Sequence, residues 1–144
     1  MEFTSIYMAR ILAIDYGGKR TGLAVTDPMQ IIATGLSTID SKELIPYLKE
    51  YFVTQSVELI IIGLPKNWDE SDTHGTPLVE AAIKKLKKEF PLIPLKTVDE
   101  RYTSKMAKDA MLQMGMKKKD RRIKGNVDII AATIILQEYL QSIQ

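Results

Sequence analysis

The sequence of 144 residues contains no cysteine, which excludes disulfide bonds, thiolate catalysis and cysteine-based zinc sites. It has no apolar run long enough to span a membrane, and its first residues, MEFTSIYM, carry an acid where a secretory signal would carry basic residues. The net charge of +2 is too small to indicate a nucleic-acid partner by itself. These absences predict a cytoplasmic protein. Met8 is an alternative start, and residues 1–8 are expected to be an extension that contributes little to the fold.

The positive charge is concentrated in two short stretches. Residues 117–124, KKKDRRIK, hold six basic side chains against one acid, and a second cluster consists of Lys84, Lys85, Lys87 and Lys88. The second cluster is best explained as the solvated face of an amphipathic helix. The first lacks the apolar periodicity that packing needs, which predicts an exposed connection that either guides nucleic acid or serves only as a linker.

The stretch from Arg10 to Asp27, RILAIDYGGKRTGLAVTD, combines two strand patterns with a loop of unusual chemistry. The apolar run at residues 11–14 predicts a buried strand that ends on Asp15, where rigid backbone would hold a carboxylate in a position that suits a cation. The Gly-Gly pair that follows predicts a tight turn, and Lys19 and Arg20 supply positive charge where a phosphate can lie. The alternative is an ordinary hairpin with a solvated basic tip.

Further apolar patterns extend this hairpin into an α/β domain. Residues 22–26 and 31–39 predict two antiparallel strands, and residues 59–62 and 95–98 predict two buried strands that run parallel to the first. The side chains expected to cap the intervening helices are Asp40 or Ser41, Thr76, residues 102–104 and Asn126. The predicted architecture is a single domain over residues 1–144, with a five-stranded mixed sheet (a three-strand antiparallel meander plus two parallel strands) flanked by helices.

Three acids stand where the predicted elements end or begin. Asp15 and Glu100 follow strands, and Asp128 lies near the start of the last helix, on the same face as Ala131 and Ala132. Clustered acids repel one another unless a divalent cation neutralises them, and Mg²⁺ or Mn²⁺ held by carboxylates commonly activates water against a phosphodiester. For Asp128 alone, a favourable interaction with the helix dipole is the simpler explanation. The order of strands and helices is that of the ribonuclease H-like fold.

Four motifs, in order, resemble those of the YqgF/RuvX family over nearly the whole chain from Arg10 to the last helix. They are D-x-G-x-K-R-x-G from Asp15, G-L-P at residues 63–65, D-E-R-x-[TS]-S from Asp99 and D-x-x-A-A from Asp128. The resemblance implies a ribonuclease H-like nuclease that processes the 5′ end of pre-16S ribosomal RNA. Resolution of Holliday junctions, which are branched DNA, is the alternative that the same family implies.

The resemblance also assigns roles to single residues. It implies that Asp15, Glu100 and Asp128 are catalytic and hold the metal, Mg²⁺ or Mn²⁺. The side chains expected to bind nucleic-acid phosphates are Lys19, Arg20, Arg101, Lys117, Lys118, Arg121 and Arg122, although Arg101 is alternatively a structural partner of Asp99. The loop KNWDESDTHGT after Pro65 is longer than the D-G-T turn usual in the family, so no role is transferred to Asp69, Asp72 or Thr76.

Two other classes of protein share parts of this pattern. Asp-x-Gly-Gly also opens the nucleotide site of actin-like and sugar kinases, but such kinases close two lobes around ATP and this chain is long enough for only one. A non-catalytic RNA-binding factor of ribosome assembly would use the same basic surface, although the presence of all three acids argues against it. We expect pre-rRNA or branched DNA as the partner, no membrane, a monomer or weak homodimer, and an exposed loop position for His74.

Overall fold

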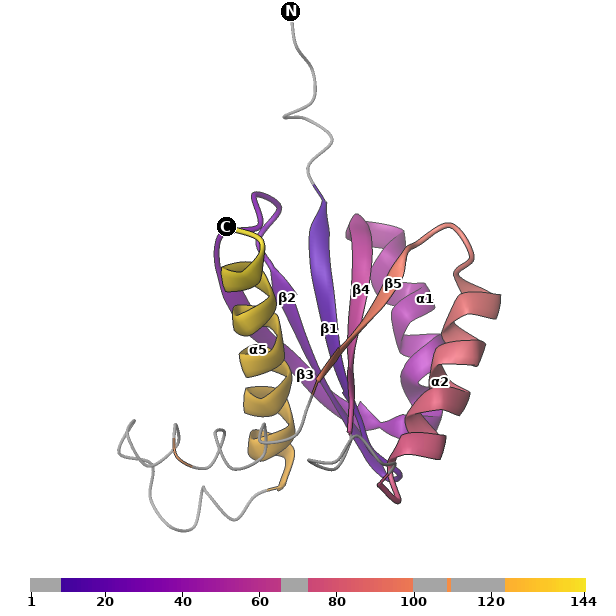
Figure 1. The fold of residues 1–144 in the computed structure, drawn as a ribbon. Coiled ribbons are helices and arrows are strands. Elements are labelled where there is room, and N and C mark those ends of the chain that lie inside the picture. The colour runs from indigo at the N-terminus through magenta and orange to yellow at the C-terminus, as the bar shows by residue number, and fades with distance from the viewer. Residues whose placement is uncertain (1–8, 66–72, 100–108, 110–123) are drawn as a thin grey trace, which may run out of the picture.

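The computed structural model of the chain describes residues 9–65, 73–99, 109 and 124–144. In these residues one sheet carries helices on both of its faces (Figure 1). Several sequence-based predictions lie outside the described residues, namely the extension at 1–8, the helix cap at 102–104 and the exposed connection at 117–123. None of the described helices is long and apolar enough to cross a membrane.

The sheet contains five strands, and their order confirms the predicted mixed topology. The strands are β1 (Arg10–Tyr16), β2 (Arg20–Thr26), β3 (Ala33–Asp40), β4 (Val57–Leu64) and β5 (Leu95–Asp99), arranged in the order β3-β2-β1-β4-β5. β1, β2 and β3 form the antiparallel meander, whereas β1 pairs with β4, and β4 with β5, in parallel. The apolar runs of β1 and β4 therefore lie at the centre of the sheet, where both of their faces are covered.

Side chains of the central strands alternate between two hydrophobic layers. On one face Leu12 and Ile14 of β1 pack with helices α1 (Leu44–Thr54) and α2 (Thr76–Glu89). On the other face Ile11 and Ala13 pack against helix α5 (Lys124–Ser142), which contributes Ala132, Ile135, Leu136 and Leu140. The predicted inward faces of α1 and α2 are confirmed, and the four lysines of α2 are exposed on its outer side, as expected for a solvated face.

The predicted helix caps are wrong at all three places that the structure describes. Asp40 precedes the short 3₁₀ turn η2 (Ser41–Glu43) without making a side-chain cap bond, because the chain enters α1 through that turn. Gly75, not Thr76, is the N-cap of α2, and the Thr76 hydroxyl donates to the Pro65 carbonyl at 2.6 Å. α5 begins at Lys124, so Asn126 lies inside the helix.

The third strand starts at Ala33, two residues later than predicted, because the preceding loop is bonded to a side chain. Asp27 accepts hydrogen bonds from the backbone N–H groups of Met29, Ile31 and Ile32, at 3.1, 2.8 and 2.7 Å. Ile31 and Ile32 thus bond to a carboxylate where a strand would bond to its neighbour, and both side chains are exposed. These bonds, that from Ile32 foremost, lower the pKa of Asp27.

The lowered pKa of Asp27 predicts a pH dependence of stability. A carboxylate with a depressed folded-state pKa stabilises the fold fully above its unfolded pKa, and that contribution is lost as the pH falls through the folded value. Asp27→Asn should therefore lower the melting temperature at neutral pH, and the gap to the parent should narrow below about pH 4. Thermal denaturation of both proteins between about pH 2.5 and 7 measures this, and a gap that stays constant over the range would contradict it.

Candidate active site

The carboxyl ends of the three parallel strands and the N-terminal end of α5 lie at the same end of the molecule (Figure 1). Asp15 lies near the end of β1, and Asp99 is the last residue of β5. Asp128 stands one turn inside α5, because the helix begins at Lys124. A helix dipole acts within the first turn, so it accounts poorly for an acid in this position.

Asp15 and Asp128 are brought to the same face of the sheet. Asp15 pairs with Gly22 across the antiparallel ladder of β1 and β2, so the two residues present the same face. A Cβ atom on Gly22 would lie 2.1 Å from the backbone carbonyl oxygen of Asp128, which shows that α5 touches the sheet at this glycine. The alternation along β1 agrees, since Ile11 and Ala13 also face α5. The Asp128 backbone therefore lies over Gly22, the cross-strand partner of Asp15, on the face that Asp15 presents.

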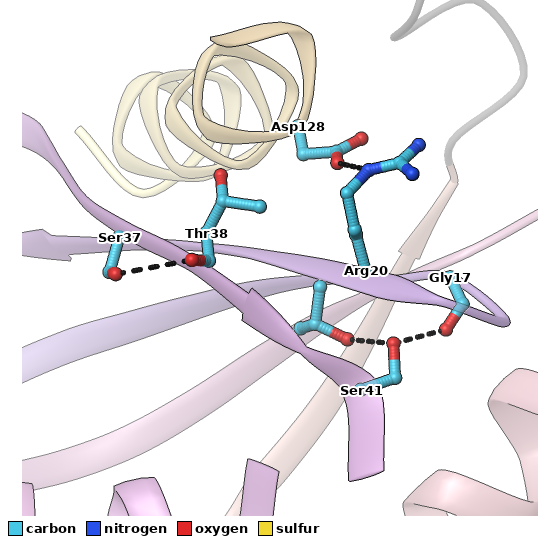
Figure 2. A network of polar contacts seen from close by, with 7 residues as sticks. Gly17, Arg20, Ser37, Thr38, Ser41 and Asp128 are labelled. Carbon is cyan, nitrogen blue, oxygen red and sulfur yellow. Dashed lines mark hydrogen bonds and ion pairs between the residues drawn. The ribbon is translucent and has the colours of Figure 1, made fainter. Parts of the chain in front are cut away.

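An ion pair holds Asp128 against the β1–β2 hairpin. The Nε atom of Arg20 donates to Oδ2 of Asp128 at 3.0 Å, as drawn in Figure 2. The Arg20 side chain is 39% exposed and the Asp128 side chain 21% exposed, so the pair lies at the edge of the solvent. Sequence reasoning assigned a phosphate to Arg20 and a metal to Asp128, and it missed their contact because the two residues are 108 positions apart.

The tip of this hairpin is fixed by Ser41, a residue that sequence reasoning expected only as a helix cap. The Ser41 backbone N–H donates to the Lys19 carbonyl at 2.9 Å, and its hydroxyl donates to the Gly17 carbonyl and lies 2.8 Å from the Thr21 hydroxyl (Figure 2). Ser41 and Thr21 are both buried. A Cβ on Gly17 would meet the Arg20 carbonyl oxygen at 2.6 Å, so the turn requires glycine. Lys19 and Arg20 therefore project from a rigid turn.

The remaining predicted site residues are placed only in part. Lys19 is exposed at the hairpin tip, and His74 is exposed in the turn before α2, as predicted. The residues outside the described part of the chain are Glu100, Arg101, Lys117, Lys118, Arg121 and Arg122. Within the described ranges no group of three acids or histidines could hold a metal ion, so a complete carboxylate site would need a ligand from beyond them, such as Glu100.

A mixed sheet of this order is that of the ribonuclease H-like fold, and solved structures confirm the fold. The chain resembles "T. thermophilus RuvC in complex with Holliday junction substrate", with a TM-score of 0.52 and 13% identity, covering 93% of this chain and 94% of that chain. It also resembles "Thermus thermophilus RuvC structure", with a TM-score of 0.50 and 12% identity, covering 92% and 95%. At such identities the likeness concerns the fold alone.

The sequence comparisons identify the family. The family model described as "RuvX: Holliday junction resolvase" matches residues 9–142. The "Putative pre-16S rRNA nuclease" of Christiangramia forsetii is 50% identical over 133 residues, covering 92% of this chain and 98% of that protein. The protein of the same name from Bacteroides fragilis is 51% identical over 135 residues, covering 94% and 98%. The chain therefore belongs to the RuvX family, a family of nucleases, which confirms the resemblance drawn from its motifs.

Proposed function

We propose that this protein is a divalent-metal-dependent nuclease that cleaves the phosphodiester backbone of pre-16S ribosomal RNA near its 5′ end. The observation that carries the proposal is the docking of α5 on Gly22, which sets Asp128 beside Asp15 at the end of the sheet. The substrate rests on the relatives that share half of the sequence over nearly its full length and are named for this RNA.

The side chains at this edge suit a hard cation. Carboxylate oxygens are the ligands that Mg²⁺ and Mn²⁺ prefer, and Asp15, Asp128 and Glu100, which follows β5 directly in the sequence, would supply them. When bound, the metal would lower the pKa of an attacking water and stabilise charge on the phosphate.

The contributions of the chain itself are orientation and electrostatics. Asp15 and Asp128 stand on β1 and α5, and regular elements hold ligands more precisely than loops do. Lys19 and Arg20, on the rigid hairpin tip, would bind phosphates next to the scissile bond, with Arg101 as a third basic contact. Phosphate contacts of this kind fix the register of the substrate and carry no sequence information.

Branched DNA is the second candidate substrate, because the matching family model is described as a Holliday junction resolvase. The deciding experiment incubates pure protein with end-labelled pre-16S RNA and, separately, with a four-way DNA junction, each with Mg²⁺ and with EDTA. We expect specific cleavage of the RNA only with Mg²⁺. Faster metal-dependent cleavage of the junction would assign the protein to branched DNA, and RNA binding without cleavage would indicate a non-catalytic assembly factor.

We further propose that the basic run at 117–124 captures the substrate. Replacing Lys117, Lys118, Arg121 and Arg122 together by Ser should weaken RNA binding and lower the salt slope of log K by about 0.7 to 0.9 for each phosphate that is no longer neutralised. Cleavage at saturating RNA should be largely retained, because the acids are untouched. The matched control replaces the four exposed lysines of α2 with Ser. Equal affinity and equal salt slope in the variant and the parent would show that the run is only a linker, and an equal fall in both variants would show a general effect of positive charge.

A further inference from the structure

Arg20 presents two separate sets of donors to the site. Its Nε bonds to Oδ2 of Asp128, whereas the two terminal nitrogens of the guanidinium point away from that carboxylate (Figure 2). In the part of the chain that the structure describes, Asp128 is the only group bonded to the Arg20 side chain. The contact is therefore a single bond, unlike the two-bonded fork that a guanidinium commonly makes with a carboxylate.

Both ends of this contact are held in place by the fold. The backbone next to Arg20 is fixed by the bonds of Ser41 to Lys19, Gly17 and Thr21. The backbone of Asp128 lies directly on Gly22, where there is no space for even a methyl group. The single bond thus joins two rigid elements, and its geometry depends on the relative position of the hairpin and α5.

We propose that Arg20 is a positioning residue that links the metal ligand to the substrate. Its Nε orients Asp128 through Oδ2 and leaves Oδ1 for the cation, while its terminal N–H groups bind a phosphate of the nucleic acid. The inference rests on the function proposed above. Ligating carboxylates are commonly oriented by such outer hydrogen bonds, whose loss typically costs about 10- to 100-fold in metal affinity. A planar guanidinium can serve two acceptors in fixed directions, which an ammonium cannot.

An alternative role for Arg20, as a placeholder for the cation, predicts the opposite change in metal affinity. If the guanidinium were only a placeholder for the cation, its positive charge would compete with the metal for Asp128, and removing it would strengthen metal binding. A general electrostatic effect predicts the same increase in metal affinity when the charge is removed, because any positive charge near the site repels a divalent cation. Lys19, the exposed neighbour at the same tip, reports that general effect without any bond to Asp128.

Calorimetric titration with Mn²⁺, in the absence of nucleic acid, separates these roles. Arg20→Gln should weaken Mn²⁺ binding by about 10-fold or more. The matched variant Lys19→Gln removes the same charge and should leave the affinity equal or slightly higher. Equal or tighter Mn²⁺ binding by Arg20→Gln would overturn the proposal. A parent protein that binds no Mn²⁺ would overturn the proposed function and this inference with it, so the two failures are distinguishable.

RNA binding measured in the presence of EDTA tests the second proposed role of Arg20, the binding of a phosphate by its terminal N–H groups. Arg20→Gln and Lys19→Gln should each lower the salt slope by about 0.7 to 0.9, the value of one phosphate contact. Arg20→Lys should restore the slope, because the charge returns, and leave the Mn²⁺ affinity reduced. If Arg20→Lys recovers both the salt slope and the Mn²⁺ affinity of the parent, a simple positive charge suffices and the oriented contact is refuted. Melting temperatures of all three variants verify that each is folded.

Discussion

Asp15→Asn is expected to abolish RNA cleavage, by about a thousand-fold or more, because metal-assisted hydrolysis depends on several kcal/mol of charge stabilisation that this carboxylate would help to supply. The fold should survive, since Asp15 is only half-buried, and asparagine has nearly the same shape. RNA binding should also be nearly unchanged, because the phosphate contacts assigned to Lys19 and Arg20 stay in place. Single-turnover cleavage rates and RNA titrations of the variant and the parent measure the two effects separately.

The matched control for this variant is Glu80→Gln, which removes an exposed carboxylate from α2 on the opposite face of the sheet. It should cleave RNA at the parental rate. If Asp15→Asn retains the parental rate, the candidate active site is wrong. If instead it loses RNA binding as strongly as cleavage, Asp15 contributes to the substrate surface and not to the chemistry.

Gly22→Ala should destabilise the protein and impair cleavage together. The added Cβ would lie 2.1 Å from the carbonyl oxygen and 2.4 Å from the carbonyl carbon of Asp128. Both atoms are backbone, so α5 itself must move away from the sheet. Overpacking of this kind costs about 1 to 3 kcal/mol, which corresponds to a fall of about 3 to 10 °C in melting temperature. Because the shift carries Asp128 away from Asp15, the cleavage rate should fall at temperatures where the variant is fully folded.

Gly18→Ala is the control for this prediction. It lies in the same hairpin, and its added Cβ would meet only the side chain of Leu78 at 3.7 Å, an ordinary packing distance. Thermal denaturation should show a small change for this variant, and its cleavage rate should stay close to that of the parent. Equal melting temperatures for Gly22→Ala and Gly18→Ala would mean that α5 does not press on Gly22 as the structure indicates.

Much of the fold could be predicted from the sequence because the patterns that indicate strands and helices lie within short segments. The apolar runs of β1 and β4 are short and rich in branched residues, and the inward positions of α1 and α2 follow the helical period. The helix caps failed in part because a capping side chain, such as that of Thr76 or Ser41, has competing partners that local patterns do not reveal. Ser41 illustrates this competition, since it bonds to a hairpin tip about 20 residues earlier in the chain.

The candidate active site could be predicted only as a set of residue types at the ends of elements. The sequence places Asp15 after a strand and Asp128 near Ala131 and Ala132, but it contains no information on how deeply α5 approaches the sheet. That depth depends on Gly22 having no side chain, and on the register that pairs Gly22 with Asp15. The same register brings Arg20 to Asp128, a contact that no local pattern in either segment indicates.

The most direct test of a shared cation site is the change in melting temperature on adding Mn²⁺. The parent is compared with a triple variant that combines Asp15→Asn, Glu100→Gln and Asp128→Asn, each measured against its own metal-free state. A cation bound only by the folded protein stabilises it by RT ln(1 + [L]/Kd), or about 2.7 kcal/mol at a concentration 100 times Kd. We predict a clear upward shift for the parent and none for the triple variant. An equal shift in both proteins would contradict the proposal that these three acids hold the metal.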